Sequence, residues 1–424
     1  MTVIPSAARN LQFDLRIDSI AAGGDGVGRH EGIVVFVPRT APGDVVRVRA
    51  RQQDRLMRGE ALELLQASPQ RTDPPCEHYV KDRCGGCQIQ HLLYDGQLAA
   101  KSGIIRDAVA RIGRVDVAAP DVEGSDRRWR YRRKLTLALR PRGDGWIAGL
   151  HRYDAPTEVF ELRDCPITQE DVLDAWRRVL EHQHLLPRAR ELRGAVRMLG
   201  RGFSFTLEGA RVWAGHSQLF AALPDLAELW WVPDAKSRRM LHSRTLRDEA
   251  GASFTQVNPG VAETLRACVV SLAAATKPRR VVDAYAGSGE LAVALATPGT
   301  RVTAIEIDRD AARVCAARLP IGSRAIAAPV EDALAEALPA DVVVLNPPRA
   351  GIDPRVTEIL APRTNGSGSR QAGTPRIIYV SCNPATLARD IKRLEVYRVQ
   401  SLRGFDMFPQ TAHVETVCEL VPAA

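Results

Sequence analysis

Two residues near the end of the chain have the types and the setting of a covalent catalyst. Cys382 lies in the tetrapeptide Ser-Cys-Asn-Pro at 381–384, directly after the apolar run Ile377–Val380, which is typical of a buried strand. A thiol at the exit of a strand, in a polar turn that precedes a helix, is placed like a nucleophile. Glu415 follows in His-Val-Glu at 413–415 and adds a carboxylate.

This pair has what methylation of a pyrimidine at carbon 5 requires. Carbon 5 of uracil is a poor nucleophile, but addition of a thiolate to carbon 6 turns the ring into an enolate with electron density at carbon 5. Carbon 5 can then attack a sulfonium methyl group, after which a base removes its proton and the thiolate leaves. Taken singly, Cys382 also fits an ordinary half-buried thiol and Glu415 a solvated strand residue. Their conjunction favours the catalytic roles.

The stretch Asp283–Gly289, DAYAGSG, has the form of a loop that binds a nucleotide cofactor. Asp283 ends an expected strand, and Gly287 and Gly289 let the backbone approach a ligand closely. Glu306 ends the next expected strand, where a carboxylate can bind ribose hydroxyls. The six residues that begin at Gly287 also satisfy the dinucleotide pattern G-x-G-x-x-A, so this motif alone leaves two cofactor classes open.

Acidic residues at successive strand ends favour S-adenosylmethionine over a nicotinamide dinucleotide. S-adenosylmethionine has no phosphate, and its cationic amino acid end suits Asp283 at the opening of the loop. Glu306 and Asp332 occupy the strand ends that follow. The next strand exit carries Asn346 in Asn-Pro-Pro-Arg, where open α/β sheets bind ligands, so Asn346 can contact the cofactor or the target base.

Four cysteines form a second candidate site. Cys76, Cys84 and Cys87 are close in sequence, and Cys165 follows with a proline after it. The Cys-Gly-Gly-Cys turn can aim two thiolates at one metal. Such a set suits an iron–sulfur cluster or a four-cysteine zinc site, and the spacing alone leaves the two near even.

Charge points to a nucleic acid partner. The net charge is +8 and the isoelectric point about 9.2. Cations pair with phosphates and aromatic rings stack on bases, and both gather at 127–134, RRWRYRRK. If this segment is a strand, alternation places its even-numbered cations on one face; a solvated charged strand is the plainer alternative. The expected RNA contacts are Arg128, Trp129, Arg130, Tyr131, Arg132, Arg133 and Lys134.

No stretch approaches the roughly 20 apolar residues of a membrane span, and the N-terminal residues lack the basic-then-apolar layout of a secretory signal. We therefore expect a cytoplasmic protein without membrane contact, and a monomer. In that compartment the eight cysteines are expected to be thiols, metal ligands or catalysts rather than disulfides.

Hydrophobic patterning divides the 424 residues into three domains. Residues 8–66 read as short strands separated by Gly and Pro turns, which predicts a small OB-like β-barrel that binds RNA. Residues 67–245 form a central, largely β domain with the cysteines and the basic segment; within it, segment 93–125 carries an amphipathic helix at 97–112 and can pack on the C-terminal domain. The expected central strands include 135–139, 202–207 and 210–214.

Residues 246–424 have the α/β pattern of a Rossmann-like domain with a mostly parallel sheet. Short apolar strands alternate there with Ala-rich helical stretches. The Gly- and Ser-rich stretch 363–374 reads as a flexible surface insertion. The expected strands of this domain are 281–283, 302–306, 342–345 and 377–380.

Several motifs resemble known families. GGDGVGR at 23–29 and PGD at 42–44 resemble a TRAM domain. The chain as far as residue 420 resembles the RNA (uracil-5-)-methyltransferases, in SFTQVN at 253–258, SCNP at 381–384 and DMFPQTAHVE at 406–415. The resemblance implies that Cys382 is the nucleophile and Glu415 the base. It also implies S-adenosylmethionine bound by Gln256, Tyr285, Glu306 and Asn346, to which the loop adds Asp283, Gly287, Gly289, Glu290 and Asp332.

The ribosomal RNA branch of this family carries a 4Fe-4S cluster at the corresponding cysteines, so the resemblance favours that cluster over zinc. It implies formation of 5-methyluridine in RNA, with 23S ribosomal RNA as the expected substrate. Two positions depart from the family: Asn346 stands where an aspartate is usual, and Gln410 where a histidine is frequent. The cysteine spacing from Cys76 to Cys84 is also longer than is usual.

Three alternatives stay open at this point. Cluster-bearing relatives also methylate transfer RNA. The Asn-Pro-Pro turn at Asn346 resembles amine methyltransferases, in which Cys382 would be idle, although Arg349 stands where those enzymes have an aromatic residue. A non-catalytic iron–sulfur protein that only binds RNA is the third reading.

Overall fold

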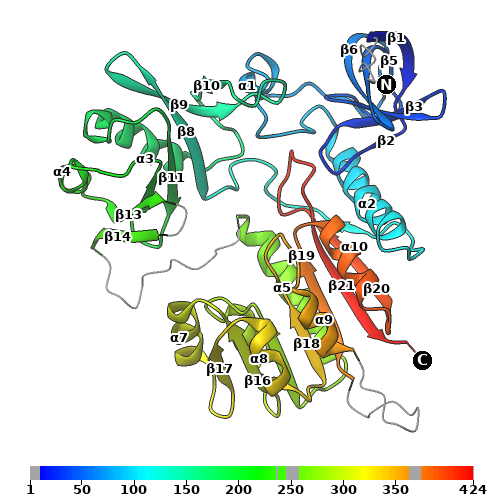
Figure 1. Ribbon diagram of the computed structural model, residues 1–424, viewed down its shortest axis with the longest axis vertical. Coiled ribbons are helices and arrows are strands. Elements are labelled where there is room, and N and C mark those ends of the chain that lie inside the picture. The colour runs from blue at the N-terminus through cyan, green and yellow to red at the C-terminus, as the bar shows by residue number, and fades with distance from the viewer. Residues whose placement is uncertain (1–9, 235–236, 245–256, 362–373, 424) are drawn as a thin grey trace, which may run out of the picture.

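The computed structural model of the chain describes residues 10–234, 237–244, 257–361 and 374–423 (Figure 1). Gln256, which was expected to bind the cofactor, and almost all of the expected insertion at 363–374 lie outside these ranges. The described residues form three sheets, each with its own apolar core, and Figure 1 shows the central and N-terminal sheets side by side above the C-terminal one.

The N-terminal sheet follows from alternating apolar residues between Gly and Pro turns. It has the order β1-β5-β6-β4-β3-β2 and is antiparallel except for the β4–β6 pair. Leu15, Val35, Val46 and Val48 point into its small core. Its strands are β1 (Asn10–Arg16), β2 (Ser19–Ile20), β3 (Gly26–His30), β4 (Ile33–Val37), β5 (Val45–Gln53) and β6 (Leu56–Gln66).

The central sheet has the order β10-β9-β8-β11-β12-β13-β14 and is antiparallel except for β12–β13. Two of its expected strands match β8 and β12. The third, at 210–214, is a loop, because Trp213 there packs into the core and its indole donates to the Leu185 carbonyl. The elements are β8 (Lys134–Arg142), β9 (Gly145–His151), β10 (Val159–Glu161), α3 (Glu170–Glu181), η1 (Gln183–Leu185), β11 (Leu192–Met198), β12 (Phe203–Glu208), α4 (His216–Ala222), β13 (Leu226–Asp234) and β14 (Ser237–Ser243).

The C-terminal sheet has the order β17-β16-β15-β18-β19-β21-β20-β7, with β17 to β19 parallel and β21 antiparallel. The four strands expected in this domain are confirmed as β15, β16, β18 and β19. The elements are α5 (Pro259–Ala274), β15 (Arg280–Ala284), α6 (Glu290–Leu295), β16 (Arg301–Glu306), α7 (Arg309–Arg318), β17 (Arg324–Ala327), α8 (Val330–Ala337), β18 (Val342–Leu345), α9 (Pro354–Leu360), β19 (Arg376–Ser381), α10 (Pro384–Arg393), β20 (Tyr397–Phe405) and β21 (Glu415–Pro422).

The later part of the segment between the first two sheets belongs in space to the third, whereas Tyr79 near its start packs in the central core. The segment begins with α1 (Glu77–Val80) and continues with α2 (Tyr94–Arg111) and β7 (Val122–Glu123). Helix α2 packs against α10, as Figure 1 shows, and β7 pairs in parallel with β20. Ile105 and Val109 of α2 are fully buried in the core of the C-terminal domain, whereas Ile112 is exposed.

The basic segment 127–134 is not the strand that alternation suggested. Strand β8 begins only at Lys134, and Arg130 has a φ of 51°, which interrupts an extended backbone. The side chains of this segment therefore point in several directions rather than to one face. Among the described residues, no helix is both long and apolar enough to span a membrane.

Candidate active site

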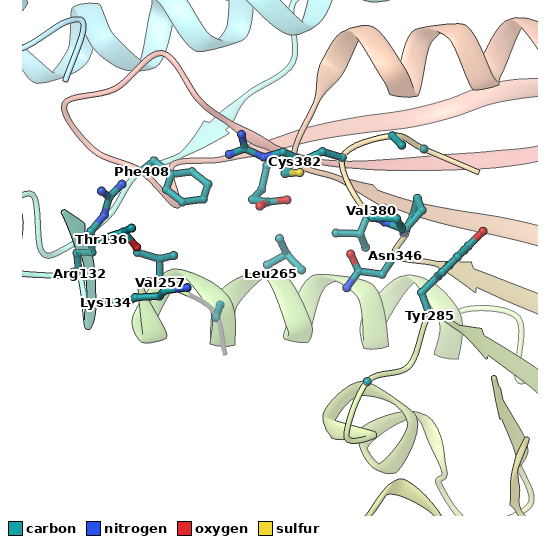
Figure 2. A pocket seen from close by; sticks show the side chains of 18 of the residues that line it. Arg132, Lys134, Thr136, Val257, Leu265, Tyr285, Asn346, Val380, Cys382 and Phe408 are labelled. Atoms are coloured by element: carbon teal, nitrogen blue, oxygen red, sulfur yellow. The ribbon is translucent and has the colours of Figure 1, made fainter. Parts of the chain in front are cut away.

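A cavity of about 1340 Å³ opens at the carboxyl ends of the parallel strands and extends to the central sheet. Figure 2 shows Arg132, Lys134 and Thr136 at one end, Cys382 and Phe408 in the middle, and Asn346 and Tyr285 at the other end. Because strand ends of an open parallel sheet gather on one edge, residues far apart in sequence meet here.

Cys382 follows β19 and precedes the first turn of α10. Asn383 caps that helix, since its side-chain oxygen accepts from the Ala385 amide at 3.1 Å. The thiol is half-buried and lines the cavity. Burial raises the pKa of Cys382, the neighbouring Glu415 carboxylate raises it further, and Arg349 opposes both through charge and a hydrogen bond to the thiol.

Glu415 is the first residue of β21 and is 4% exposed. Burial raises the pKa of its carboxyl to about 7, with Arg349 acting in the opposite direction. A carboxyl with a pKa near neutrality can accept a proton in one step and release it in the next. Cys382, Glu415 and Arg349 thus form one electrostatically coupled group on the wall of the cavity.

The cofactor loop follows β15 at the other end of the cavity. Tyr285 and Gly287 have positive φ angles of 66° and 55°, which bend the backbone toward the cavity that both residues line. The Gly287 amide donates to one oxygen of Glu306 at 2.8 Å, and the Asp308 amide donates to the other at 2.9 Å. Glu306 therefore lies fixed at the cavity wall with lone pairs left for a ligand.

Four other expected cofactor residues have different placements. Glu290 and Asn346 line the cavity, and the Glu290 carboxylate is 3.3 Å from Arg266. Gly289 lies behind the loop, where any Cβ would collide with the Cys315 sulfur. Asp283 is 1% exposed beneath the lining, where burial raises its pKa to about 7, and its Oδ2 has no partner among the described residues.

Asp332 does not line the cavity, contrary to the sequence-based expectation. It is half exposed in the first turn of α8 and pairs with Arg355 at 2.8 Å. The preceding residue, Glu331, lines the cavity in its place. Helix α8 begins at Val330, and consecutive helical residues point in directions about 100° apart. A strand end at this position would have given the opposite choice.

The four cysteines Cys76, Cys84, Cys87 and Cys165 are free, buried and line one region of the same cavity. Burial raises the pKa of Cys87 to about 12 and of Cys84 to about 11, and Cys165 raises both further. Gln90 hydrogen-bonds the thiols of Cys76 and Cys87, but its Oε1 has no partner among the described residues. Across all the residues that the structure describes, no group of three or more His, Cys, Asp or Glu side chains is arranged to hold a metal ion.

Comparisons with known proteins identify this arrangement. A family model described as tRNA (Uracil-5-)-methyltransferase matches residues 330–421, which include Cys382 and Glu415. An uncharacterized RNA methyltransferase of Thermosynechococcus vestitus is 31% identical, over 96% of this chain and 97% of its own. The chain belongs to the RNA (uracil-5-)-methyltransferase family. It is thus an RNA methyltransferase.

Two further comparisons cover the whole enzyme. An uncharacterized RNA methyltransferase of Protochlamydia amoebophila is 29% identical, over 96% of this chain and 97% of its own. The crystal structure of Pyrococcus abyssi tRNA (uracil-54, C5)-methyltransferase in complex with S-adenosyl-L-homocysteine has a TM-score of 0.66 and 24% identity, covering 96% of this chain and 100% of that one. The methyltransferase fold therefore extends along nearly the full length described here.

The loop at 406–414, which leads into Glu415 of this methyltransferase, is held from outside its own domain. Lys101 on α2 is fully buried; its ammonium pairs with the Asp406 carboxylate and donates to the Phe408 carbonyl at 3.0 Å. Gln97 exchanges two hydrogen bonds with Gln410, both at 2.9 Å. Sequence reasoning missed these residues, although Lys101 lies one helical turn before Ile105, on the apolar side of the predicted helix.

The basic segment of the methyltransferase divides into anchors and lining residues. Tyr131 is 1% exposed and donates to the Pro409 carbonyl at 3.0 Å, so it cannot stack on a base, contrary to expectation. Arg130 pairs with Asp164 and Glu170. Trp129 packs on the central core, Arg128 lies over the Tyr94 ring at 3.9 Å, and Arg133 is half-buried. Of the expected set, the cavity lining includes Arg132 and Lys134.

Proposed function

We propose that this enzyme methylates carbon 5 of a uridine in 23S ribosomal RNA, with S-adenosylmethionine as methyl donor. The observation that supports this most directly is the coupling of Cys382 and Glu415 at the middle of a cavity that the cofactor loop completes. An amine methyltransferase does not need this pair, and it would leave a cysteine and a buried carboxylate without a role.

The first step is addition of the Cys382 thiolate to carbon 6 of uracil. Arg349 donates to the sulfur and lowers its pKa, so it favours the thiolate that attacks. The carbon–sulfur bond moves the electron pair of the 5,6 double bond onto carbon 5 and the carbonyl oxygen. The Glu415 carboxylate raises the pKa of the Cys382 thiol, so the two groups titrate as a coupled pair.

The second and third steps transfer the methyl group and regenerate the enzyme. S-adenosylmethionine, when bound, supplies a methyl group on a positively charged sulfur. Carbon 5 bonds to this methyl group with its electron pair, while the bond from the methyl group to the donor sulfur breaks, its electrons stay on that sulfur, and S-adenosylhomocysteine leaves. The Glu415 carboxylate then removes the proton of carbon 5, that electron pair restores the double bond, and the bond from carbon 6 to the Cys382 sulfur breaks. The thiolate leaves, and Glu415 carries the proton away.

The residues at the far end of the cavity fit the methyl donor. Glu306 is positioned for the ribose hydroxyls, and Tyr285 and Asn346 line the space beside it. At position 346, where an aspartate is usual in the family, the Asn346 amide supplies hydrogen-bond donors in place of a negative charge. Asp283 is buried at the end of β15, just before the loop. Gln256 remains a predicted ligand outside the described residues.

The cysteine set is proposed to hold a 4Fe-4S cluster. Burial raises the pKa of Cys76, Cys84 and Cys87, so these thiols ionise most readily on a metal, and the Gln90 oxygen without a partner among the described residues supports a further group in this pocket. A cluster binds ligand sulfurs that lie farther apart than those of a single ion. Iron and sulfide content and visible absorbance should fall in Cys87→Ser but not in Cys268→Ser.

Transfer RNA is the second candidate substrate. The P. abyssi protein, whose name specifies tRNA uracil-54, matches this chain over nearly its whole length, and the matching family model is described in the same terms. The N-terminal sheet and the four cysteines support the ribosomal substrate through the resemblance to the cluster-bearing branch. The following experiment separates the two.

The test combines purified enzyme, S-adenosylmethionine and RNA that contains 5-fluorouridine. Fluorine on carbon 5 cannot be removed as a proton, so the enzyme should stall as a covalent RNA–protein adduct that survives denaturation. The adduct should form with ribosomal RNA and be absent in Cys382→Ala, with Cys268→Ala as the matched control. An adduct with transfer RNA only would change the substrate, and no adduct with either RNA would exclude the covalent mechanism.

A further inference from the structure

The central sheet has two different faces. Along β11, Leu192, Gly194 and Val196 are buried, and Trp176 of α3 covers them: any Cβ at Gly194 would lie 2.4 Å from its ring. The alternate residues Arg193 and Arg197 lie on the opposite face and are exposed or half-buried. We call this opposite face the open face; it carries Lys134, Thr136, Arg193, Arg197, Trp230 and Arg238.

Like charges are concentrated on the open face. Lys134 of β8 lies directly opposite Arg197 of β11 in the strand register, an arrangement that destabilises a sheet. Burial lowers the pKa of Lys134, and Arg197, Arg193 and Arg238 lower it further. Glu208 pairs with Arg193 at 3.4 Å and compensates part of this charge. Binding of a polyanion would neutralise these cations and relieve their mutual repulsion, which would contribute to the binding free energy.

The same face offers an aromatic platform. Trp230 is half-buried, and its indole nitrogen donates to Glu228 at 2.9 Å. The Arg238 guanidinium lies 4.2 Å from the centre of the Trp230 ring, and Met240, opposite Trp230 in the register, is 41% exposed. Rings and guanidinium planes of this kind stack on unpaired bases whatever their sequence.

The open face is continuous with the active site. Lys134 and Thr136 line the cavity at the end opposite Tyr285 and Asn346, with Cys382 between, as Figure 2 shows. If the methyl donor occupies the Tyr285 end of the cavity, the RNA backbone that adjoins a uridine at Cys382 leaves the cavity at the Lys134 end. The chain of cations and the indole then lie along its path.

We propose that the open face of the central sheet binds a single-stranded segment of the substrate RNA that adjoins the target uridine. This inference rests on the proposed function, which sets the course of the RNA from Cys382 toward Lys134. Lys134, Arg193, Arg197 and Arg238 contact phosphates, and Trp230 stacks on a base. The segment is unpaired because a stacked duplex presents no base faces to Trp230.

The test compares two RNAs, one with and one without an unpaired flank beside the target uridine. Arg238→Glu should weaken binding of the flanked RNA at least about tenfold and lower the salt dependence of binding by about one phosphate contact. Trp230→Ala should weaken it by about 5- to 100-fold. Arg177→Glu makes the same charge change on the exposed side of α3 and should have no effect.

Each result separates this inference from the proposed function. Wild-type binding of the flanked RNA by both variants would overturn the open-face assignment while leaving the covalent chemistry intact. Loss of binding in both variants, together with a wild-type enzyme that forms no fluorouridine adduct, would support the surface and reject the proposed chemistry. If Trp230→Ala instead dissociates a dimer in sedimentation, the face joins two copies of the chain and the RNA assignment fails. Arg238 is exposed, so Arg238→Glu is expected to fold and keeps the test decisive.

Discussion

The cofactor loop and the loop at 406–414, which we call the base loop after the proposed role of Glu415, leave the same sheet but are held in place by different parts of the chain. In the cofactor loop, the Ala286 amide donates to the Ile305 carbonyl at 3.0 Å and the Gly287 amide to Glu306, both within the C-terminal domain. In the base loop, Asp406 and Gln410 are bound by Lys101 and Gln97, which lie about 300 residues earlier.

The difference separates two halves of one reaction. The half proposed to hold the methyl donor is complete within its own domain. The half that places Glu415 depends on α2 and on the cysteine-bearing turn, since the Gln88 and Ile89 amides also donate to the Gln410 carbonyl at 3.2 Å. Changes in the central part of the chain should therefore affect the base and spare the donor site.

The largest effect is expected from Glu415→Gln. Loss of the base should lower turnover by about 10²- to 10⁴-fold while the Cys382 adduct still forms, because addition and methyl transfer do not need a carboxylate. Denaturing gels with ordinary uridine RNA should show this adduct accumulating, and calorimetry should show donor binding unchanged. Glu395→Gln, on the exposed side of the same domain, serves as the control. Loss of the adduct together with turnover would assign Glu415 to an earlier step.

Removal of the buried cation comes next. Lys101→Met leaves Asp406 buried without its cation, with only the Tyr94 hydroxyl still donating to its carboxylate, and should reduce the free energy of unfolding by about 3–5 kcal/mol, measured by urea denaturation. The double variant Lys101→Met/Asp406→Leu should recover much of that loss. At temperatures where the single variant stays folded, turnover should fall and donor affinity should not. Equal loss of donor affinity would refute the division between the two loops.

The pH dependence of stability gives a third comparison. Burial raises the pKa of Glu415 from its ordinary 4.5 to about 7. A folded pKa above the unfolded value stabilises the fold fully below pH 4.5, and this contribution disappears as the pH rises through 7. Glu415→Gln does not titrate, so relative to wild type it should gain about 3 kcal/mol of unfolding free energy between about pH 4.5 and 8. A pH-independent difference would place the carboxyl in water.

The smallest expected effect is in the cofactor loop. Glu306→Gln loses a carboxylate that accepts from the Gly287 and Asp308 amides and should bind the donor at least about tenfold more weakly. Asp332→Asn, outside the cavity, should leave donor affinity unchanged. Adduct formation with 5-fluorouridine RNA at saturating donor should be normal in both. A larger effect of Asp332→Asn than of Glu306→Gln would restore the original sequence-based assignment.

The residues of this site that could be predicted from the sequence are those that lie in short contiguous motifs. Cys382 follows the end of β19 and Glu415 begins β21, and the two meet at one sheet edge because these neighbouring strands are antiparallel. Asp332 was misjudged because it is the third residue of helix α8 and does not end a strand. The pair of Lys101 and Asp406 could not be found from spacing, since partners brought together by tertiary packing leave no periodic signal.

The basic segment shows the same limit. Its composition indicated RNA contact, but composition does not distinguish Tyr131, buried with its hydroxyl bonded, from Lys134, which lines the cavity. The left-handed residue Arg130 breaks the alternation on which the prediction depended.

Strand β7 and helix α2 also affect how the chain matures. They emerge from the ribosome early, yet their partners α10, β20 and Asp406 come last, and the Lys101–Asp406 pair spans 305 residues. At about 5–20 residues per second, α2 waits roughly 15–60 seconds with its apolar side uncovered. The C-terminal domain thus combines residues that are translated early with residues that are translated last. This long separation favours slow folding and a need for chaperone protection.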